Sequence, residues 1–276
     1  MATIDYKIHS ASNRLPVNQD ETIVYHYTNS ESFKNILLQG NIRLTHFKCL
    51  NDSYEGKILF EDILDIIKDS EFRALLEERY NVALRNLYIG SFSRHGNLLS
   101  QWKNYGNVCI GLDLEKNKRL NLGHIIEDSI CRNADTSGVQ IVPCSYINGD
   151  TKKYAVNFVK WFKENRTESS DILALLVGSS VFHLKHIKFQ EEQELRIIAY
   201  LWRRNPYKDS NKDYINYIIH PKAIRKIVVG PSNQQDIILG DICAFLNKLK
   251  EDYTHVEIWK STIPYTKHSG DRTLNY

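Results

Sequence analysis

Apolar and polar positions along the chain follow two different periods. From Val108 to Leu114 every second residue is apolar, which is the period of a strand with one face in a core. Between Asn29 and Gly40 the apolar positions recur at helical spacing, with a capping side chain at the start and a glycine at the end. Segments of both kinds alternate along the chain, so the sequence predicts a mixed α+β fold.

The same two periods predict the remaining elements. Strands are expected at residues 23–25, 42–44, 87–93, 108–114, 139–147, 195–201, 214–219, 224–229 and 256–259. Helices are expected at 29–40, after a cap at 51–53, after Ser70, and at 98–105, 153–163, 172–184 and 237–249, with a polar loop at 117–137. We therefore expect a single α+β domain at residues 22–265, built on a mixed or largely antiparallel sheet with inserted helices. Residues 1–21 are expected to form an N-terminal extension, and residues 266–276 a C-terminal tail.

Composition excludes few partners. The chain has 276 residues, 42% of them hydrophobic, and its formal charge of +3 arises from 36 basic and 33 acidic residues, so charge alone predicts no polyanion partner. The five cysteines contain no Cys-x-x-Cys pair, which argues against a zinc site or a disulfide framework and favours a reducing cytoplasm. Because no apolar segment has the length of a signal peptide core or a membrane span, we expect a soluble, cytoplasmic protein without a membrane partner.

Several common enzyme signatures are missing from the sequence. There is no Gly-Lys-Ser/Thr phosphate loop, no strand-borne run of three spaced glycines, no Gly-x-Ser-x-Gly elbow and no His-Glu-x-x-His pair. Ordinary nucleotide hydrolases, dinucleotide dehydrogenases, esterases and zinc peptidases are therefore disfavoured.

Two polar clusters follow predicted strands and are candidates for ligand binding. His26, with Tyr27 and Thr28, ends the first strand, where an imidazole and a hydroxyl can hold a ribose hydroxyl. Ser91 and Ser93 share one face of a later strand and can present two hydroxyls to a cleft. The alternatives are a structural histidine and serines that cap a loop, and both alternatives stay open.

Carboxylates and aromatic rings complete the candidate set. Glu192 and Glu194 are expected on one strand face, where Glu194 can stabilise the cationic sugar that forms when a nicotinamide–ribose bond breaks. Trp102 and Tyr105 lie one helical turn apart and can stack on a nicotinamide or adenine ring. The alternatives are a charged strand edge that faces solvent for the glutamates, and core packing for Trp102.

The combination of short motifs resembles a large bacterial family that is known as a domain of unknown function. The resemblance covers roughly residues 22–265. It rests on Tyr25-His26-Tyr27-Thr28, Leu50-Asn51-Asp52 with Glu55, Ser91-Phe92-Ser93, Trp102 with Tyr105-Gly106, Glu192-x-Glu194-x-Arg196, Ile227-Val228-Val229-Gly230-Pro231 and Lys260-Ser261-x-Ile263-Pro264.

A second resemblance supplies an activity. His26-Tyr27-Thr28 is similar to the His-x-Thr start of ADP-ribosyltransferases and RNA phosphotransferases of that fold. Ser91 and Ser93 are similar to the second motif of the toxin-like branch, and Glu192-Gln193-Glu194 to its Glu-x-Glu motif. That branch begins with an arginine, so Arg43 and Arg94 are the candidates for a phosphate contact.

This resemblance implies an ADP-ribosyltransferase-like fold and an enzyme that uses NAD as substrate. Glu194 would be the catalytic glutamate and Glu192 its acceptor-activating partner. His26, Tyr27, Thr28, Ser91, Ser93, Trp102 and Tyr105 would bind NAD. The acceptor would be a protein or nucleic acid, and the role that of a bacterial toxin or phage-defence effector with a possible antitoxin or immunity partner.

Two other functions stay open. One is a metal-dependent nuclease in which Asp52, Glu55, Glu192 and Glu194 hold a divalent ion and the turn at residues 203–204 meets phosphate. The other is a non-catalytic domain that binds nucleic acid or protein and uses the same polar residues as caps and edges.

Overall fold

The computed structural model describes residues 6–11, 23–50, 54–121, 125–126, 137–148, 151–165, 170–201 and 213–264. The fold is a mixture of helices and mostly antiparallel strands, as the sequence predicts. The chain divides into two compact units, each described here by itself: Met1–Ile42, Phe92–Gly123 and Ile218–Tyr276 form the first, and Arg43–Ser91 and His124–Tyr217 the second. A single domain at residues 22–265 stays a prediction. No helix in the described part of the chain is long and apolar enough to cross a membrane.

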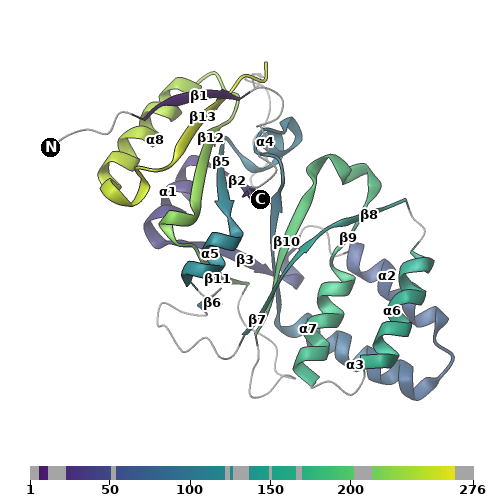
Figure 1. Cartoon of the computed structure of the whole chain (residues 1–276). Coiled ribbons are helices and arrows are strands. Elements are labelled where there is room, and N and C mark those ends of the chain that lie inside the picture. Colours follow the sequence, from purple (N-terminus) through teal and green to yellow (C-terminus); the bar gives the residue numbers. More distant parts are fainter. Residues whose placement is uncertain are drawn as a thin grey trace. The chain divides into compact units, whose positions relative to one another are not determined.

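In the part of the chain that the structure describes, five strands lie side by side in the first unit (Figure 1). They are β1 (Ile8–Ala11), β13 (Glu257–Ser261), β12 (Ile224–Val229), β5 (Val108–Asp113) and β2 (Ile23–Thr28), in that spatial order. The pairs of β13 with β1 and β12 are parallel, whereas β5 pairs antiparallel with β12 and β2. The helices are α1 (Ser30–Gln39), α4 (Leu99–Tyr105), α5 (Leu114–Asn121) and α8 (Gln235–Leu249).

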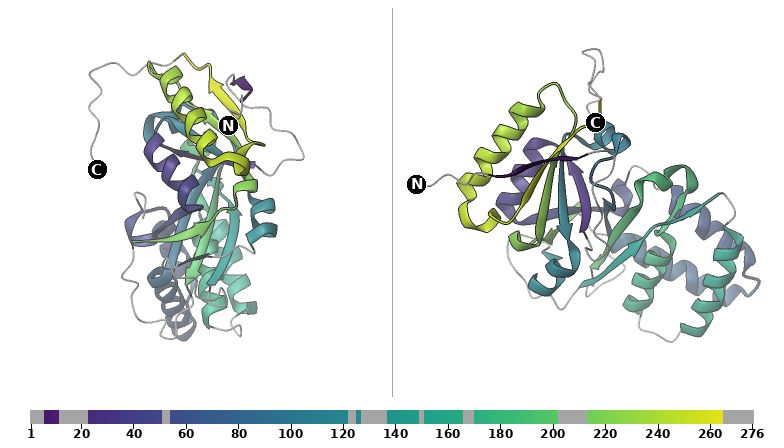
Figure 2. Two further views of the ribbon diagram at one scale, coloured as in Figure 1. Left: turned by 90° about the vertical axis from the view of Figure 1, so that its left-hand side faces the viewer. Right: turned by 45° about the horizontal axis from the view of Figure 1, so that its top comes forward.

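Local signals set the bounds of α1, as predicted. The Asn29 side chain accepts a hydrogen bond from the backbone N–H of Ser32 at 2.8 Å, and Gly40 ends the helix in the left-handed region at φ 63°. The helix then packs beside α8 (Figure 2), where the rings of Phe33 and Phe245 meet edge to face at 6.2 Å.

Gly111 in β5 allows neighbouring side chains of the first unit to pack closely against the strand. A Cβ atom at Gly111 would lie 2.9 Å from the Cβ atom of Lys226 and 3.1 Å from the Tyr25 ring. The sequence predicts a close approach of backbone or ligand at this glycine. In the structure, the Lys226 and Tyr25 side chains make that approach.

The second unit combines strands with a group of four helices (Figure 1). Its helices are α2 (Tyr54–Ile66), α3 (Ser70–Asn86), α6 (Lys152–Asn165) and α7 (Ser170–Val181). Its strands are β6 (Ile125–Ile126), β7 (Ser137–Pro143), β8 (Ser145–Ile147), β9 (Leu184–His186) and β10 (Glu194–Leu201). Strands β3 (Asn41–His46), β4 (Leu87–Ser93) and β11 (Tyr214–Ile218) each contain a boundary between the units. β10 pairs with β4 and antiparallel with β7, while β8 and β9 form a separate parallel pair.

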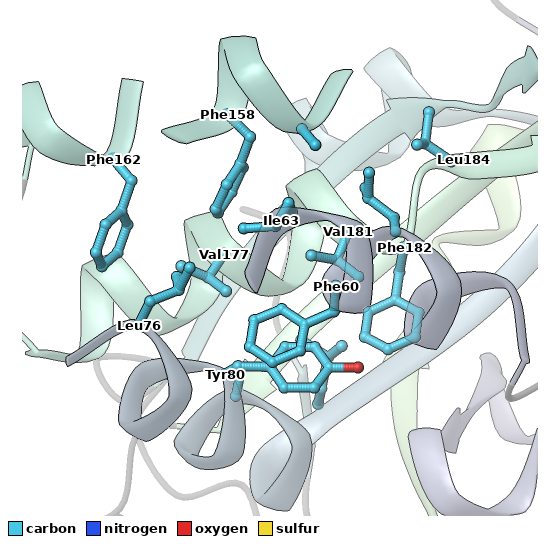
Figure 3. Packing of buried hydrophobic residues seen from close by; sticks show 14 of the residues in the cluster. Phe60, Ile63, Leu76, Tyr80, Phe158, Phe162, Val177, Val181, Phe182 and Leu184 are labelled. Atoms are coloured by element: carbon cyan, nitrogen blue, oxygen red, sulfur yellow. The ribbon is translucent and has the colours of Figure 1, made fainter. Parts of the chain in front are cut away.

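Aromatic and aliphatic side chains pack together in the core of the second unit (Figure 3). Helix α3 packs on α7, and α2 packs on α6. The rings of Phe60 and Tyr80 stack with centroids 3.6 Å apart, and those of Phe72 and Phe162 meet at 5.3 Å. Asp69 caps α3 by accepting hydrogen bonds from two backbone N–H groups of its first turn. This core covers the face of β10 that carries Ile198 and Tyr200.

Three predicted segments differ in the structure. The segment predicted as a polar loop from residue 117 begins inside α5, a helix fixed by polar contacts: the buried Asn117 amide donates to the carbonyl of Ile218, and its Oδ1 accepts from the N–H of His220. The predicted strand at 139–147 is two strands, because the chain leaves β7 at Cys144 and pairs with β9 instead. Strand β1 lies within the predicted extension, and its pairing with β13 joins distant parts of the sequence.

Candidate functional site

A partly buried ionic cluster surrounds Glu194 in the second unit. Lys185 Nζ lies 2.6 Å from Glu192 Oε2 and 2.5 Å from Glu194 Oε2, and Arg196 Nε lies 2.8 Å from Glu194 Oε1. The Glu194 side chain is 5% exposed, and those of Lys185 and Glu192 are each 13% exposed. Two basic and two acidic groups therefore balance in a region that is largely removed from solvent.

The backbone between β9 and β10 brings these charges together. Lys185 lies in β9, Glu192 ends the 3-10 helix Ile187–Glu192, and Glu194 begins β10. Gln193 has φ 44°, the only positive φ of a non-glycine residue in the described part of the chain. The prediction that Glu192 and Glu194 share one strand face is therefore wrong, because Glu192 lies in the 3-10 helix and the left-handed Gln193 separates it from β10. The two carboxylates meet at Lys185 instead.

Backbone groups hold the cluster from two further sides. Arg196 Nη1 donates to the carbonyl oxygen of Phe182 at 2.7 Å, just beyond the end of α7. The backbone N–H of Glu194 donates to the Tyr146 hydroxyl at 2.6 Å. These contacts restrict the rotamers of Arg196 and the start of β10, so the Glu194 carboxylate is held in one position.

Glu194 is ionised at neutral pH. Burial alone would raise the pKa of Glu194, but the charges and hydrogen bonds of Arg196 and Lys185 outweigh it and lower the pKa to about 2. For Lys185, burial would lower the pKa, but Glu194 and Glu192 together raise it above the ordinary lysine value. Both partners therefore stay charged over the whole physiological range.

An exposed aromatic ring lies beside this cluster. Lys185 Nζ is 4.9 Å from the centroid of the Phe189 ring, which is 41% exposed. Lys185 and Phe189 are not predicted as site residues by the sequence, because they lie nine and five residues before Glu194 and share no period with it. The density of charge between residues 185 and 196 is the available signal, and a charged edge that faces solvent is one of the two interpretations that the sequence leaves open.

The residues predicted around His26 lie in the first unit, where most of them are packed. The His26 ring is half-buried with its centroid 5.5 Å from that of Phe92. Tyr27 is buried, and its hydroxyl donates to the His95 carbonyl and accepts from the N–H of Leu98. Thr28 is buried as well, and its carbonyl oxygen would lie 2.6 Å from a Cβ atom at Gly106.

The two predicted stacking residues differ in exposure. Trp102 is 5% exposed; its ring packs edge-on to Tyr27 at 4.6 Å and against Gly230, and its Nε1 donates to Asn97. Core packing accounts for these contacts. Tyr105, at the end of α4, is 53% exposed and presents its ring to solvent.

The two serines fall on opposite sides of a unit boundary within β4. Ser91 is exposed and belongs to the second unit. Ser93 is buried in the first unit, where its hydroxyl accepts a hydrogen bond from the His95 N–H at 3.0 Å, the geometry of a local turn. The NAD-binding roles of His26, Tyr27, Thr28, Ser91, Ser93, Trp102 and Tyr105 stay predictions.

The predicted metal and phosphate ligands are only partly included in the described residues. Asn51 and Asp52 lie outside the described residues, as do residues 203–204. Among the residues that the structure describes, no group of three or more His, Cys, Asp or Glu side chains could hold a metal ion. Of the two candidate phosphate ligands, Arg43 lies over the ring of Tyr214 at 4.2 Å in the second unit, and Arg94 is exposed in the first.

Comparison of the chain with family models, curated proteins and solved structures finds no match in any of the three. The geometry of the Glu194 cluster is therefore the main support for a function.

Proposed function

We propose that the protein is an ADP-ribosyltransferase-like enzyme that breaks the nicotinamide–ribose bond of NAD and transfers ADP-ribose to a protein or nucleic-acid acceptor. The observation that carries the proposal is the buried, ionised carboxylate of Glu194, held between Lys185 and Arg196. An ADP-ribosyltransferase-like fold, a role as toxin or phage-defence effector, and an antitoxin or immunity partner belong to the same proposal.

The chemistry requires a fixed negative charge. When the C–N bond breaks, nicotinamide leaves with the bonding electron pair and the ribose becomes an oxocarbenium cation. A carboxylate that is already oriented and desolvated stabilises this cation without reorganising at the moment of reaction. The Glu194 carboxylate is 5% exposed, contacts both Lys185 and Arg196, and stays ionised with a pKa of about 2, which supports this role.

The neighbours of Glu194 provide the remaining roles in the second unit. Glu192, which shares Lys185 with Glu194, would accept the proton of the attacking acceptor hydroxyl or amine. The exposed ring of Phe189 would offer a wall for a planar leaving group. Lys185 would have to release Glu192 when the acceptor binds.

Nicotinamide release tests the proposal directly. Purified protein is incubated with NAD and a panel of proteins, RNA and DNA, and nicotinamide and mass shifts of the acceptors are measured by chromatography and mass spectrometry. We expect Glu194→Gln to lower nicotinamide release by about 100-fold or more. Glu192→Gln should retain hydrolysis of NAD by water but lose transfer to the acceptor.

Glu77→Gln is the matched control, because Glu77 is in the same unit and forms an exposed ion pair with Arg73 that is unrelated to the cluster. This variant should keep full activity. The proposal is wrong if the wild-type protein releases no nicotinamide with any acceptor, or if Glu194→Gln releases it at the wild-type rate.

One observation favours a second candidate function, that of a non-catalytic binding domain. Both carboxylate oxygens of Glu194 are engaged within the protein, one by Lys185 and one by Arg196, as in a structural ion pair. On this view the second unit is a non-catalytic binding domain. Absence of NAD turnover together with a large loss of stability in Glu194→Gln would support this candidate.

A further inference from the structure

A pocket of about 560 Å³ lies in the second unit, between α6, β7 and the end of α7. This volume is in the range of small-molecule sites, which are typically several hundred Å³. The pocket does not contain Glu194, so no part of the proposed transfer chemistry accounts for it.

The walls of the pocket are apolar and aromatic. Helix α6 contributes Tyr154, Phe158 and Trp161, whose positions place three rings along one stretch of helix. The rings of Phe158 and Trp161 are 5.6 Å apart at their centroids. Phe158 is buried in the core of the unit, whereas Tyr154 is 36% exposed. Such a surface favours a flat ring as ligand.

The polar groups of the pocket are uncharged. Two side-chain amides, Gln140 from β7 and Asn157 from α6, line it, and neither has a hydrogen-bonding partner among the described residues. Among the lining residues that the structure describes there is no Asp, Glu, Lys or Arg. Burial lowers the pKa of His183, which also lines the pocket, and together with the charge of Arg196 it outweighs the hydrogen bonds to the Ser179 and Ser180 backbone, so the imidazole is neutral at physiological pH.

We infer that this pocket binds an uncharged planar heteroaromatic ring that carries a hydrogen-bond donor next to an acceptor. Nucleobases and nicotinamide share this chemistry. A side-chain amide presents one donor and one acceptor side by side, which matches such an edge, while aromatic walls hold the face of the ring. An anionic ring is disfavoured because the described part of the lining contains no cation to replace the hydration that the ring would lose.

The pocket is connected to the ionic cluster by backbone contacts. The carbonyl of His183 accepts a hydrogen bond from the N–H of Ser145, and the carbonyl of the preceding Phe182 accepts from Arg196. A ligand that contacts His183 therefore lies one residue from a group that positions Arg196. The inference goes beyond the proposed function, since it requires binding and no turnover.

Binding of adenine and of nicotinamide to the full chain, measured by isothermal titration calorimetry and saturation-transfer NMR, tests the inference. We expect at least one of the two to bind with a dissociation constant of about 1 mM or tighter, which is a modest affinity for a ring of about ten heavy atoms. Nicotinate, which has the same ring and a negative charge, should bind at least about tenfold more weakly. Binding of adenine alone would assign the site to nucleobases, and binding of nicotinamide alone to nicotinamide.

Point variants test whether the ring binds in this pocket or elsewhere on the protein. Asn157→Leu removes one amide from an exposed helical position, and Trp161→Ala removes one wall; each should weaken binding by about tenfold. Val156→Ala, on the same helix but outside the pocket and 54% exposed, is the control and should leave binding unchanged.

Because Asn157 is exposed, its variant should fold even if Trp161→Ala does not. The inference is overturned if neither ring binds, if nicotinate binds as tightly as nicotinamide, or if Asn157→Leu binds with wild-type affinity. These results are independent of nicotinamide release from NAD, so failure of the pocket and failure of the proposed enzyme are distinguishable.

Discussion

Replacing Glu194 by Gln should remove a specific part of the acid sensitivity of this protein. The carboxyl group has a pKa of about 2 in the folded protein and an ordinary value of 4.5. At about 1.4 kcal/mol for each pH unit, this difference corresponds to about 3 kcal/mol of stabilisation. The value applies to a side chain that is 5% exposed, so screening by solvent reduces it little.

The direction in which stability changes with pH follows from the lowered pKa of Glu194. A carboxyl group whose folded pKa is depressed stabilises the fold above its unfolded pKa, and this stabilisation is lost as the pH falls through the folded value. The contribution of Glu194 should therefore be complete at pH 6, begin to decline below about pH 5 and be gone near pH 2. The raised pKa of Lys185 acts only at alkaline pH and leaves this window unchanged.

Urea unfolding followed by circular dichroism measures the effect. The difference in free energy of unfolding between wild type and Glu194→Gln should be about 3 to 5 kcal/mol at pH 7, since the substitution removes the carboxylate that Arg196 and Lys185 share and leaves Lys185 with Glu192 alone. It should shrink by about 2 kcal/mol at pH 3, because Glu194 of the unfolded wild type is then mostly protonated while the folded protein still holds it ionised, so that unfolding takes up a proton. All other carboxylates titrate in both proteins and cancel.

The exposed pair of Arg73 and Glu77 provides the control, with side chains 45% and 42% exposed. Glu77→Gln should cost no more than about 0.5 kcal/mol at either pH. A difference between wild type and Glu194→Gln that stays constant from pH 7 to pH 3 would refute the argument, because it would mean that the charge of Glu194 contributes nothing to the folded state.

Three further predictions concern single side chains. Gly230→Ala should lower stability by about 1 to 3 kcal/mol in thermal unfolding, because its Cβ atom would lie 2.6 Å from the Trp102 ring; a melting temperature equal to that of the wild type would contradict the packing. Asn117→Ala should cost about 2 to 3 kcal/mol in urea unfolding, since this fully buried side chain makes two hydrogen bonds to backbone groups, and a cost below about 0.5 kcal/mol would disprove their contribution. If the proposed enzyme is correct, the rate of nicotinamide release should show no titration of Glu194 between pH 5 and pH 8, and an acidic limb in that range that disappears in Glu194→Gln would be inconsistent with a pKa of about 2.

Much of the secondary structure could be predicted from local sequence. Strands β4 and β12 occupy their predicted residues, and α3 begins at Ser70. These segments carry their own periodicity or capping signals. Helix α5 was missed because its sequence is mostly polar, and its buried Asn117 is satisfied by residues about a hundred positions away.

The sequence predicts the carboxylates of the candidate site but not the residues that pair with them. The sequence singles out Glu192 and Glu194 as carboxylates, but the identity of their partners depends on how β9, the 3-10 helix and β10 fold back on each other. Lys185 reaches both glutamates through this reversal, and the left-handed Gln193 allows it. The pocket beside α6 had no sequence signal, since its rings and amides come from separate elements.

The sequence by itself determined what short-range forces control. The Asn29 cap and the Gly40 stop are satisfied within a few residues and predict the same helix bounds in any context. The alternation from Val108 to Leu114 predicts the strand β5, but pairing with β2 and β12 decides that both of its faces are buried. Tertiary structure alone decided which charges are buried and paired. Removing Glu194 from water raises its pKa, and only the arrival of Lys185 and Arg196 within about 3 Å reverses that effect. Burial and charge pairing act through space, so they become defined only when the strands and helices have packed.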